Sequence, residues 1–230
     1  MGKIRDVVET SLAITWDHPP CSDIELPKVG EEWARYEERC FDLAKRTMAT
    51  THSEEEIADA YVKCLTFHDS SSSFTVKVAR DSLHAWRLHH YMSFAMGDEP
   101  MGPKDLIARM GTQFTWEELL VAPGAHSVEE GFRASYRRSF QHSRLIINGF
   151  GYAAGREFFA SDRGHIGWAP PGAKAGDEIY MFHGCKLPFV IRRAVRPGGY
   201  YRLIGACYVQ GFVDGEGLEL PVETTTIKLI

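Results

Sequence analysis

The chain has 230 residues, a formal net charge of −5 at pH 7, 44% hydrophobic residues and 25% charged residues. These values are typical of a soluble globular protein, and the length allows one large domain or two small ones. The negative charge gives no electrostatic reason to expect nucleic acid as a partner, since the densest basic run, residues 133–144, has the spacing of a solvated helix face.

Neither a secretory leader nor a membrane anchor is expected. The first ten residues lack an apolar run, and Asp6 stands where a myristoylation site requires serine or threonine. No stretch has the roughly 18 apolar residues of a membrane span. The five cysteines are widely and unevenly spaced, which favours reduced thiols over a disulfide framework. The sequence therefore predicts a cytoplasmic protein without a membrane partner.

The first half of the chain has the pattern of amphipathic helices. Residues 1–30 contain three prolines and few periodic apolar positions, so we expect an extended entry segment there. Apolar residues at spacings of three and four then predict helices over residues 31–50 and 78–96. Between these helices, Ser53 with Glu56 matches a capping box and predicts the start of a further helix.

The pattern stays helical up to about residue 146. Pro103 fits the first turn of a short helix, and one more helical turn with a loop is expected over residues 112–126. Ser127 with Glu130 matches a second capping box, which predicts a helix that ends near Ile146.

After Gly149 the spacing of apolar residues changes from about 3.6 to about 2, and turn-forming residues become frequent. The predicted strands are 156–160, 165–168, 178–182, 189–193, 200–210 and 222–229. Closure of such short strands removes their exposed edges, so a small antiparallel β-barrel is expected. The predicted fold class is therefore α+β. A mainly helical part, residues 1–148, would pack on a β-barrel part, residues 149–230, in one compact unit.

The C-terminal half also resembles a known family. Its motifs are Gly-Arg-x-Phe-Phe (155–159), Gly-x-x-Gly (164–167), Gly-Asp (176–177), Pro-Phe-x-x-Arg (188–192) and a Tyr-x-Leu-x-Gly-x-Cys-Tyr-Val segment that runs on to Asp-Gly-Glu (201–216). In this order they are similar to the region that follows the HET (heterokaryon incompatibility) domain in filamentous-fungal proteins. The resemblance is firm from about residue 130 onward and weak before it.

The HET domain itself, which is similar to TIR-type death-signalling folds, is absent from the sequence, so none of its activity is implied here. Gln210 also stands where many family members have histidine. The resemblance implies a stand-alone recognition or regulatory module with a protein partner. A fragment of a longer protein, inactive alone, is a further interpretation, which the start at Met1 weighs against.

Arg192 is the most informative charged residue of this region. It follows three apolar residues on a predicted strand, so part of its side chain is expected to be buried. A buried guanidinium needs a partner, which Asp177, Asp214 or Glu216 would supply. Binding of a substrate carboxylate is the alternative, and the structural pair is the simpler interpretation.

Other candidate catalytic groups lie in predicted turns. Asp214 and Glu216 flank Gly215, where two carboxylates would act as acid and base or bind a cation, although Asp-Gly often serves only as a turn. His183 and Cys185 would form an activated thiolate if their side chains met. Two residues apart on a turn, they need not meet.

No cofactor or metal is indicated. His84, His89 and His90 share one predicted helix, but their spacing differs from the i, i+4 pair of a zinc-binding helix. Surface or packed histidines are therefore the simpler interpretation. The sequence also contains no nucleotide-binding loop.

Two functions remain open. A recognition module predicts a contiguous exposed apolar patch. A cofactor-independent cyclase, isomerase or lyase of fungal specialised metabolism instead predicts a pocket of several hundred cubic ångströms for a small apolar metabolite, at the barrel or in the crevice between helices and barrel. The groups expected to serve such a site are His165, His183, Arg192, Tyr208, Asp214 and Glu216.

Overall fold

The computed structural model describes residues 4–8, 26–96, 134, 138–195, 198–214 and 225–230. The helix expected near Pro103, the turn that follows it and the capping box of Ser127 and Glu130 lie outside these ranges, and so does Glu216. None of the helices within the described ranges is long and apolar enough to cross a membrane.

The chain forms two compact units, each assembled from separate stretches of sequence. The first unit combines Met1–Thr15, Glu38–Val76 and Gly149–Ile230, and the second combines Trp16–Glu37 and Lys77–Asn148. The expected division into a mainly helical part, residues 1–148, and a β-barrel part, residues 149–230, stays a prediction.

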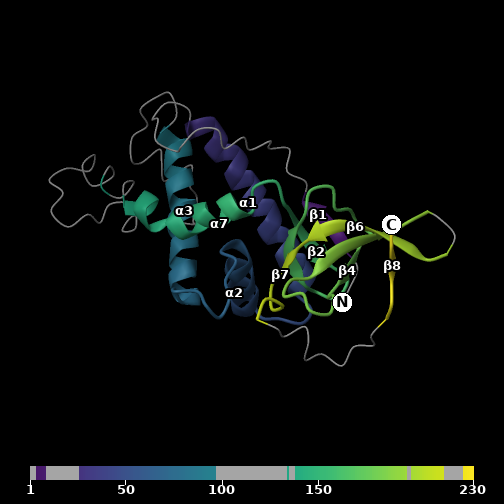
Figure 1. Cartoon of the computed structure of the whole chain (residues 1–230). Helices are drawn as coiled ribbons and strands as arrows, with labels where there is room; N and C mark the ends of the chain where they lie inside the picture. Colours follow the sequence, from purple (N-terminus) through teal and green to yellow (C-terminus); the bar gives the residue numbers. More distant parts are fainter. Residues whose placement is uncertain (1–3, 9–25, 97–133, 135–137, 196–197, 215–224) are drawn as a thin grey trace. The chain divides into compact units, whose positions relative to one another are not determined.

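Two four-stranded sheets make up much of the first unit (Figure 1). The strands of the first sheet, in spatial order, are β1 (Ile4–Val8), β2 (Glu157–Ser161), β3 (Ile166–Ala169) and β7 (Tyr208–Val209). Those of the second sheet are β4 (Glu178–Tyr180), β5 (Phe189–Arg193), β6 (Tyr200–Ala206) and β8 (Lys228–Leu229). All neighbours are antiparallel except β6 and β8, which are parallel.

The α+β class is confirmed, whereas closure of the strands into one barrel is not seen among the described residues. The long strand predicted over 200–210 divides at Cys207, whose N–H donates to the carbonyl of Pro188, so β6 and β7 belong to different sheets. β1 was expected to be part of an irregular entry segment. It forms a strand because it pairs with β2, far away in the sequence, which no local signal indicates.

One hydrophobic core cluster draws on both sheets. Its members are Ile4, Phe159, Ala169, Ala173, Ile179, Val190, Cys207, Val209 and Phe212. Ile4 also ties β1 to the turn before β4, because its N–H donates to the carbonyl of Asp177 and its carbonyl accepts from the N–H of Gly176. The two sheets are therefore joined by side-chain packing and by backbone hydrogen bonds.

Helix α2 (Glu54–Leu65) belongs to the same unit and packs on the first sheet. Its predicted capping box is present: the N–H of Glu56 donates to Ser53 Oγ at 3.3 Å, and the N–H of Ser53 donates to Glu56 Oε2 at 2.8 Å. At the other end of α2, Trp168 Nε1 donates to the carbonyl of Cys64 at 3.0 Å, and the hydroxyl of Tyr208 donates to the carbonyl of His68 at 3.1 Å.

Two long helices, α1 (Leu26–Met48) and α3 (Val76–Met96), correspond to the two amphipathic helices predicted on either side of α2. Within the second unit they are joined by a two-point ion pair. Arg87 donates to the carboxylate of Glu37 from Nη2 at 2.6 Å and from Nε at 3.1 Å. The carboxylate is 5% exposed, so this pair satisfies a charge that would otherwise be costly to bury.

Helix α7 (Arg144–Tyr152) extends six residues past the end predicted near Ile146. Gly149 and Gly151 suggested that the helix stops, but both are helical. The two glycines differ in their surroundings. A Cβ at Gly149 would overlap the carbonyl oxygen of Leu65, whereas a Cβ at Gly151 would have no neighbour within 4 Å. Gly149 therefore allows α7 to pass close to the backbone at the end of α2.

This contrast predicts opposite effects of the same substitution. Gly149→Ala is expected to lower the free energy of unfolding by at least about 2 kcal/mol, because backbone atoms must move to admit the methyl group. Gly151→Ala is expected to raise it by up to about 1 kcal/mol, since alanine favours the helix more than glycine does. Urea unfolding of both variants checks this, and equal effects would contradict the close approach of α7 to α2.

Candidate functional site

Arg192 is used structurally. Its Nε donates to Asp177 Oδ1 at 2.7 Å and its Nη2 donates to Asp177 Oδ2 at 2.8 Å and to the carbonyl of Gly172 at 2.7 Å. The Asp177 side chain is 3% exposed and also accepts from the N–H of Lys174. The hydrogen bond to Asp177 raises the pKa of Arg192. The guanidinium thus joins β5 to the turn that precedes β4, in agreement with the structural interpretation.

Two further candidates also have structural partners. The carboxylate of Asp214 accepts from Ser70, from its N–H at 2.9 Å and its hydroxyl at 2.6 Å, and so fixes the loop after α2. Tyr208 is 6% exposed and its hydroxyl donates to the carbonyl of His68. The sequence alone did not distinguish this structural use of the two side chains from a catalytic one.

The histidine candidates lie in different surroundings. His165 packs edge-on against Phe212 with ring centroids 4.8 Å apart, and burial lowers its pKa. His183 is exposed in the turn between β4 and β5, and Cys185 follows in the same turn. Glu216 is not among the described residues. Each described candidate has its own local environment, and a shared catalytic constellation is not indicated.

The remaining thiols and histidines give no reactive centre in the described residues. Burial raises the pKa of the Cys64 thiol well above its usual range and that of Cys207 to about 12, so both stay protonated in the core. Burial, followed by the charge of neighbouring His89, lowers the pKa of His90 to about 4. No group of three histidine, cysteine or acidic side chains in these ranges is arranged to hold a metal ion.

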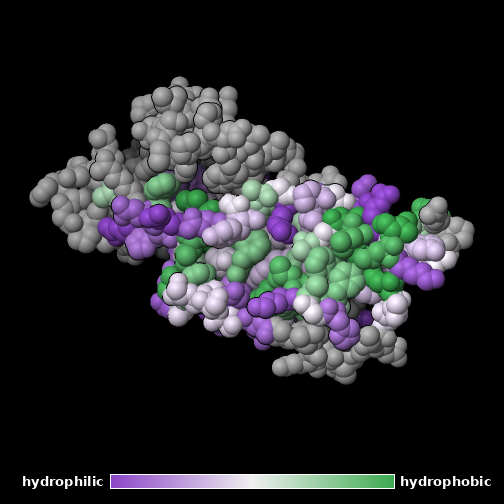
Figure 2. All heavy atoms as spheres, in the orientation of Figure 1, coloured by the Kyte–Doolittle hydropathy of each residue, from purple (hydrophilic) through white to green (hydrophobic). Residues whose placement is uncertain are grey.

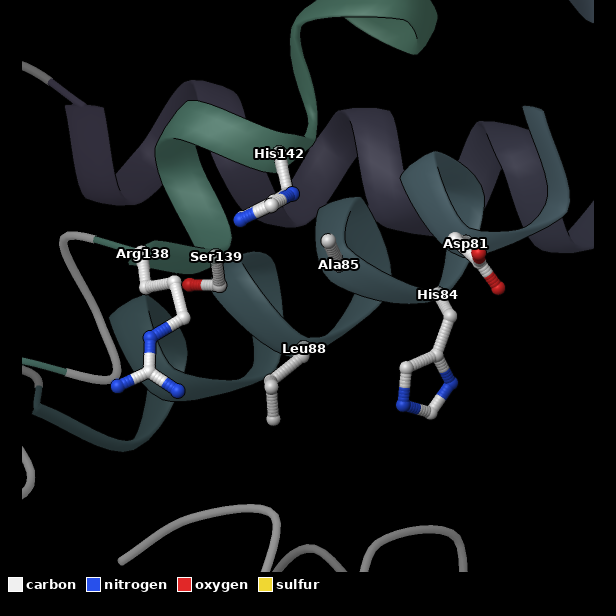
Figure 3. Close-up of a pocket in the computed structure, with 7 residues that line it drawn as sticks. All are labelled: Asp81, His84, Ala85, Leu88, Arg138, Ser139 and His142. Carbon is white, nitrogen blue, oxygen red and sulfur yellow. The ribbon is translucent and has the colours of Figure 1, made fainter. Parts of the chain in front are cut away.

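A small open pocket lies in the second unit (Figure 3). Its volume is about 140 Å³, and it is lined by Asp81, His84, Ala85, Leu88, Arg138, Ser139 and His142. A pocket for an apolar metabolite is expected to have several hundred cubic ångströms and a mostly apolar lining. This pocket is smaller, more polar and formed by none of the six predicted site residues, so it gives no support to the predicted cyclase, isomerase or lyase.

The feature with the composition of a binding site is one face of the second sheet. Ile179 and Val190, paired across β4 and β5, belong to the core cluster. Side chains alternate between the faces of a strand, so the paired Tyr180 and Phe189 point the other way. We call this the outer face. By pairing and alternation, its members are Glu178, Tyr180, Phe189, Ile191, Arg193, Tyr201, Leu203 and Leu229.

Two tyrosines cover the middle of the outer face. Tyr180 and Tyr201 come from the strands on either side of β5, yet their ring centroids are 6.2 Å apart. The rings therefore lean toward each other across β5, over Ile191, which is 0% exposed. The hydroxyl of Tyr180 donates to Glu178 Oε2 at 3.1 Å, which fixes one ring further.

Around these tyrosines the outer face is exposed and apolar. Leu203 is 44% exposed and Leu229 is 48% exposed. The loops and chain beside the sheet add Leu187, Val195 and Ile230, also exposed. In Figure 2, hydrophobic residues gather over the part of the molecule where Figure 1 draws β6 and its neighbours. Scattered exposed leucines are ordinary, but a group on one sheet indicates an interaction surface.

The stretch of sequence that contains β4, β5 and β6 carries an excess of positive charge. Residues 171–206 contain six basic residues (Lys174, Lys186, Arg192, Arg193, Arg196 and Arg202) and two acidic ones (Asp177 and Glu178), a formal charge of +4. The whole chain has −5. On the outer face itself the charged residues are Arg193, which is exposed, and Glu178, which accepts from the hydroxyl of Tyr180.

Comparison with known proteins supports the resemblance suggested by the C-terminal motifs. Residues 130–223 match a family model described as the Het-6 beta-barrel domain. Over 102 residues the chain is 26% identical to Heterokaryon incompatibility protein 6, OR allele, of Neurospora crassa, an alignment that covers 44% of this chain and 15% of that protein. No solved structure matches the chain.

The predicted similarity to fungal heterokaryon incompatibility proteins is thus confirmed. The match spans only about 15% of the length of that relative. The family model is named for a barrel, whereas the described strands of this chain form two four-stranded sheets.

The Arg192 geometry predicts that a lysine cannot replace the arginine. Arg192→Lys keeps the charge but loses the two-point contact with Asp177, and we expect a loss of about 1–2 kcal/mol in the free energy of unfolding. Arg193→Lys, one residue further and exposed, is the matched control and should change stability by less than about 0.5 kcal/mol. Equal losses in urea unfolding would contradict a structural role for Arg192.

The outer face predicts an unusual tyrosine titration. Burial, followed by the hydrogen bond to Glu178, raises the pKa of Tyr180 to about 12. An unfolded tyrosine ionises near pH 10, so this group stabilises the fold below about pH 10 and loses that contribution as the pH rises toward 12. Absorbance titration up to about pH 11 should give the same phenolate signal for the native protein and Tyr180→Phe.

The denatured proteins provide the control for this titration. In urea the Tyr180→Phe variant should lack one phenolate that the unsubstituted chain shows near pH 10. If the native protein instead shows one phenolate more than native Tyr180→Phe below about pH 11, Tyr180 ionises like an exposed tyrosine. That result would contradict the packing of Tyr180 against the sheet.

Proposed function

We propose that this chain is a recognition module that binds a protein partner through the outer face of its second sheet. The observation that carries the proposal is the group of half-buried tyrosine and exposed leucine and arginine side chains on that face. Tyrosine and arginine are enriched among the residues that dominate binding energy at protein interfaces. The similarity to fungal heterokaryon incompatibility proteins is consistent with a recognition or regulatory role.

The packing of the outer face suits a preformed interface. Tyr180 and Tyr201 already rest on each other over Ile191, so binding would freeze little additional side-chain freedom. Leu203 and Leu229 beside them offer apolar surface that a partner would remove from water. A rigid aromatic centre with apolar surroundings is thus available without rearrangement of the sheet.

Arg193 indicates one feature of the partner. Its guanidinium is exposed on the outer face, where it would pair with a carboxylate beside the apolar part of the partner's surface. Charged contacts of this type speed association and weaken as salt rises. We further propose that the encounter takes place in the cytoplasm, where the buried thiols Cys40, Cys64 and Cys207 would remain reduced.

Substitution of Leu203 tests this surface. Leu203→Glu places a carboxylate in the apolar part of the outer face, where a partner would have to bury it, and binding should weaken at least about tenfold. Val78→Glu is the matched control: Val78 lies on α3, in the other unit, and is 47% exposed, compared with 44% for Leu203.

The measurement combines identification and affinity. Proximity labelling of the chain expressed in Neurospora crassa would identify neighbouring proteins, and calorimetry with each purified candidate would follow. A true partner binds the Val78→Glu variant as it binds the unsubstituted chain, and binds Leu203→Glu at least about tenfold more weakly. It also binds Arg193→Glu more weakly, and this loss of affinity is larger at low salt than at high salt. Retention of every partner by Leu203→Glu, with its fold intact by circular dichroism, would show that the outer face is not the binding surface.

A further inference from the structure

The open pocket of the second unit has the lining of a small-anion site, independently of the outer face. Helix α3 contributes Asp81, His84, Ala85 and Leu88, a stripe at spacings of three and four that faces one way. The helical residues 138–142 contribute Arg138, Ser139 and His142. The volume of about 140 Å³ admits a phosphate or a small carboxylic acid.

The two walls of the pocket are fixed to each other. Ser82, 3% exposed, donates from its hydroxyl to the carbonyl of His142 at 2.7 Å. Seven residues along α3, about two helical turns away, the ring of His89 packs against Phe140 with centroids 5.1 Å apart. A hydrogen bond and a ring contact between the same two segments give the pocket a defined shape before any ligand arrives.

The polar groups are divided between the two ends of the pocket. Figure 3 shows Arg138, Ser139 and His142 together at one end, with Ala85 and Leu88 between them and the end that carries Asp81 and His84. Ser139 is 4% exposed, so its hydroxyl lies at the base of the polar end. Arginine with a hydroxyl and an imidazole is a donor set that matches the oxygens of an anion.

Asp81, the acidic residue of the lining, lies away from the end of the pocket where an anion would bind. The Asp81 carboxylate lies at the other end from Arg138 and is 3.6 Å from the ammonium group of Lys77, which reduces its repulsion of an anion. An anion at Arg138 would therefore have donors on one side and the apolar side chains of Ala85 and Leu88 on the other.

We propose that this pocket binds a small anion, a phosphate or carboxylate group held by Arg138, Ser139 and His142, with a short apolar part of the ligand on Ala85 and Leu88. The forked guanidinium of Arg138 would contact two anion oxygens, and the Ser139 hydroxyl and the His142 ring would contact the others. With so few contacts, the affinity for the bare anion is expected to be on the order of millimolar.

The test uses the whole chain and three probes: inorganic phosphate, acetate and butyrate, each followed by NMR or calorimetry at low ionic strength. Arg138→Gln should weaken binding of the preferred probe at least about tenfold, and Asp81→Asn should leave it equal or tighter. Arg163→Gln, an exposed arginine in a turn of the first unit, is the matched control and should bind like the unsubstituted chain.

The three probes identify the source of the anion. Preference for phosphate indicates a phosphorylated ligand, and preference for butyrate over acetate indicates a carboxylic acid whose apolar part contacts Ala85 and Leu88. The proposal is overturned if no probe binds at millimolar concentrations, or if Arg138→Gln and Arg163→Gln weaken binding equally. It is also overturned if Arg138→Gln, with unchanged thermal unfolding, binds as tightly as the unsubstituted chain.

Discussion

The joint between the end of helix α2 and the first sheet is the contact on which the first unit depends. Two aromatic side chains from adjacent strands add hydrogen bonds to the backbone in the last turn of α2 and in the loop after it. Trp168 and Tyr208 are paired directly across β3 and β7, and each donates to a carbonyl at or just after the end of α2. Phe67 lies against both rings, with a φ of 50° that non-glycine residues rarely adopt.

This joint uses two of the most suggestive residues of the C-terminal region: Tyr208 donates to the backbone after α2, and Asp214 holds the same loop through Ser70. In the second sheet, Arg192 has a comparable structural use, because it joins β5 to the turn before β4 through Asp177. The glycine at position 167 is required by the same region of the structure, because a Cβ there would overlap the carbonyl oxygen of Tyr208. Residues of the C-terminal motifs therefore make contacts that hold helix, loops and sheets together.

The sequence predicts those features that are encoded locally. The capping box of Ser53 and Glu56, the bounds of β5 and the pairing of Arg192 with an acidic residue each rest on a short pattern with one physical meaning. The strand β1, the division of the long strand at Cys207 and the continuation of α7 past Gly149 each depend on a distant partner. The outer face was missed because alternation shows that a strand has two faces but not which one packs inward.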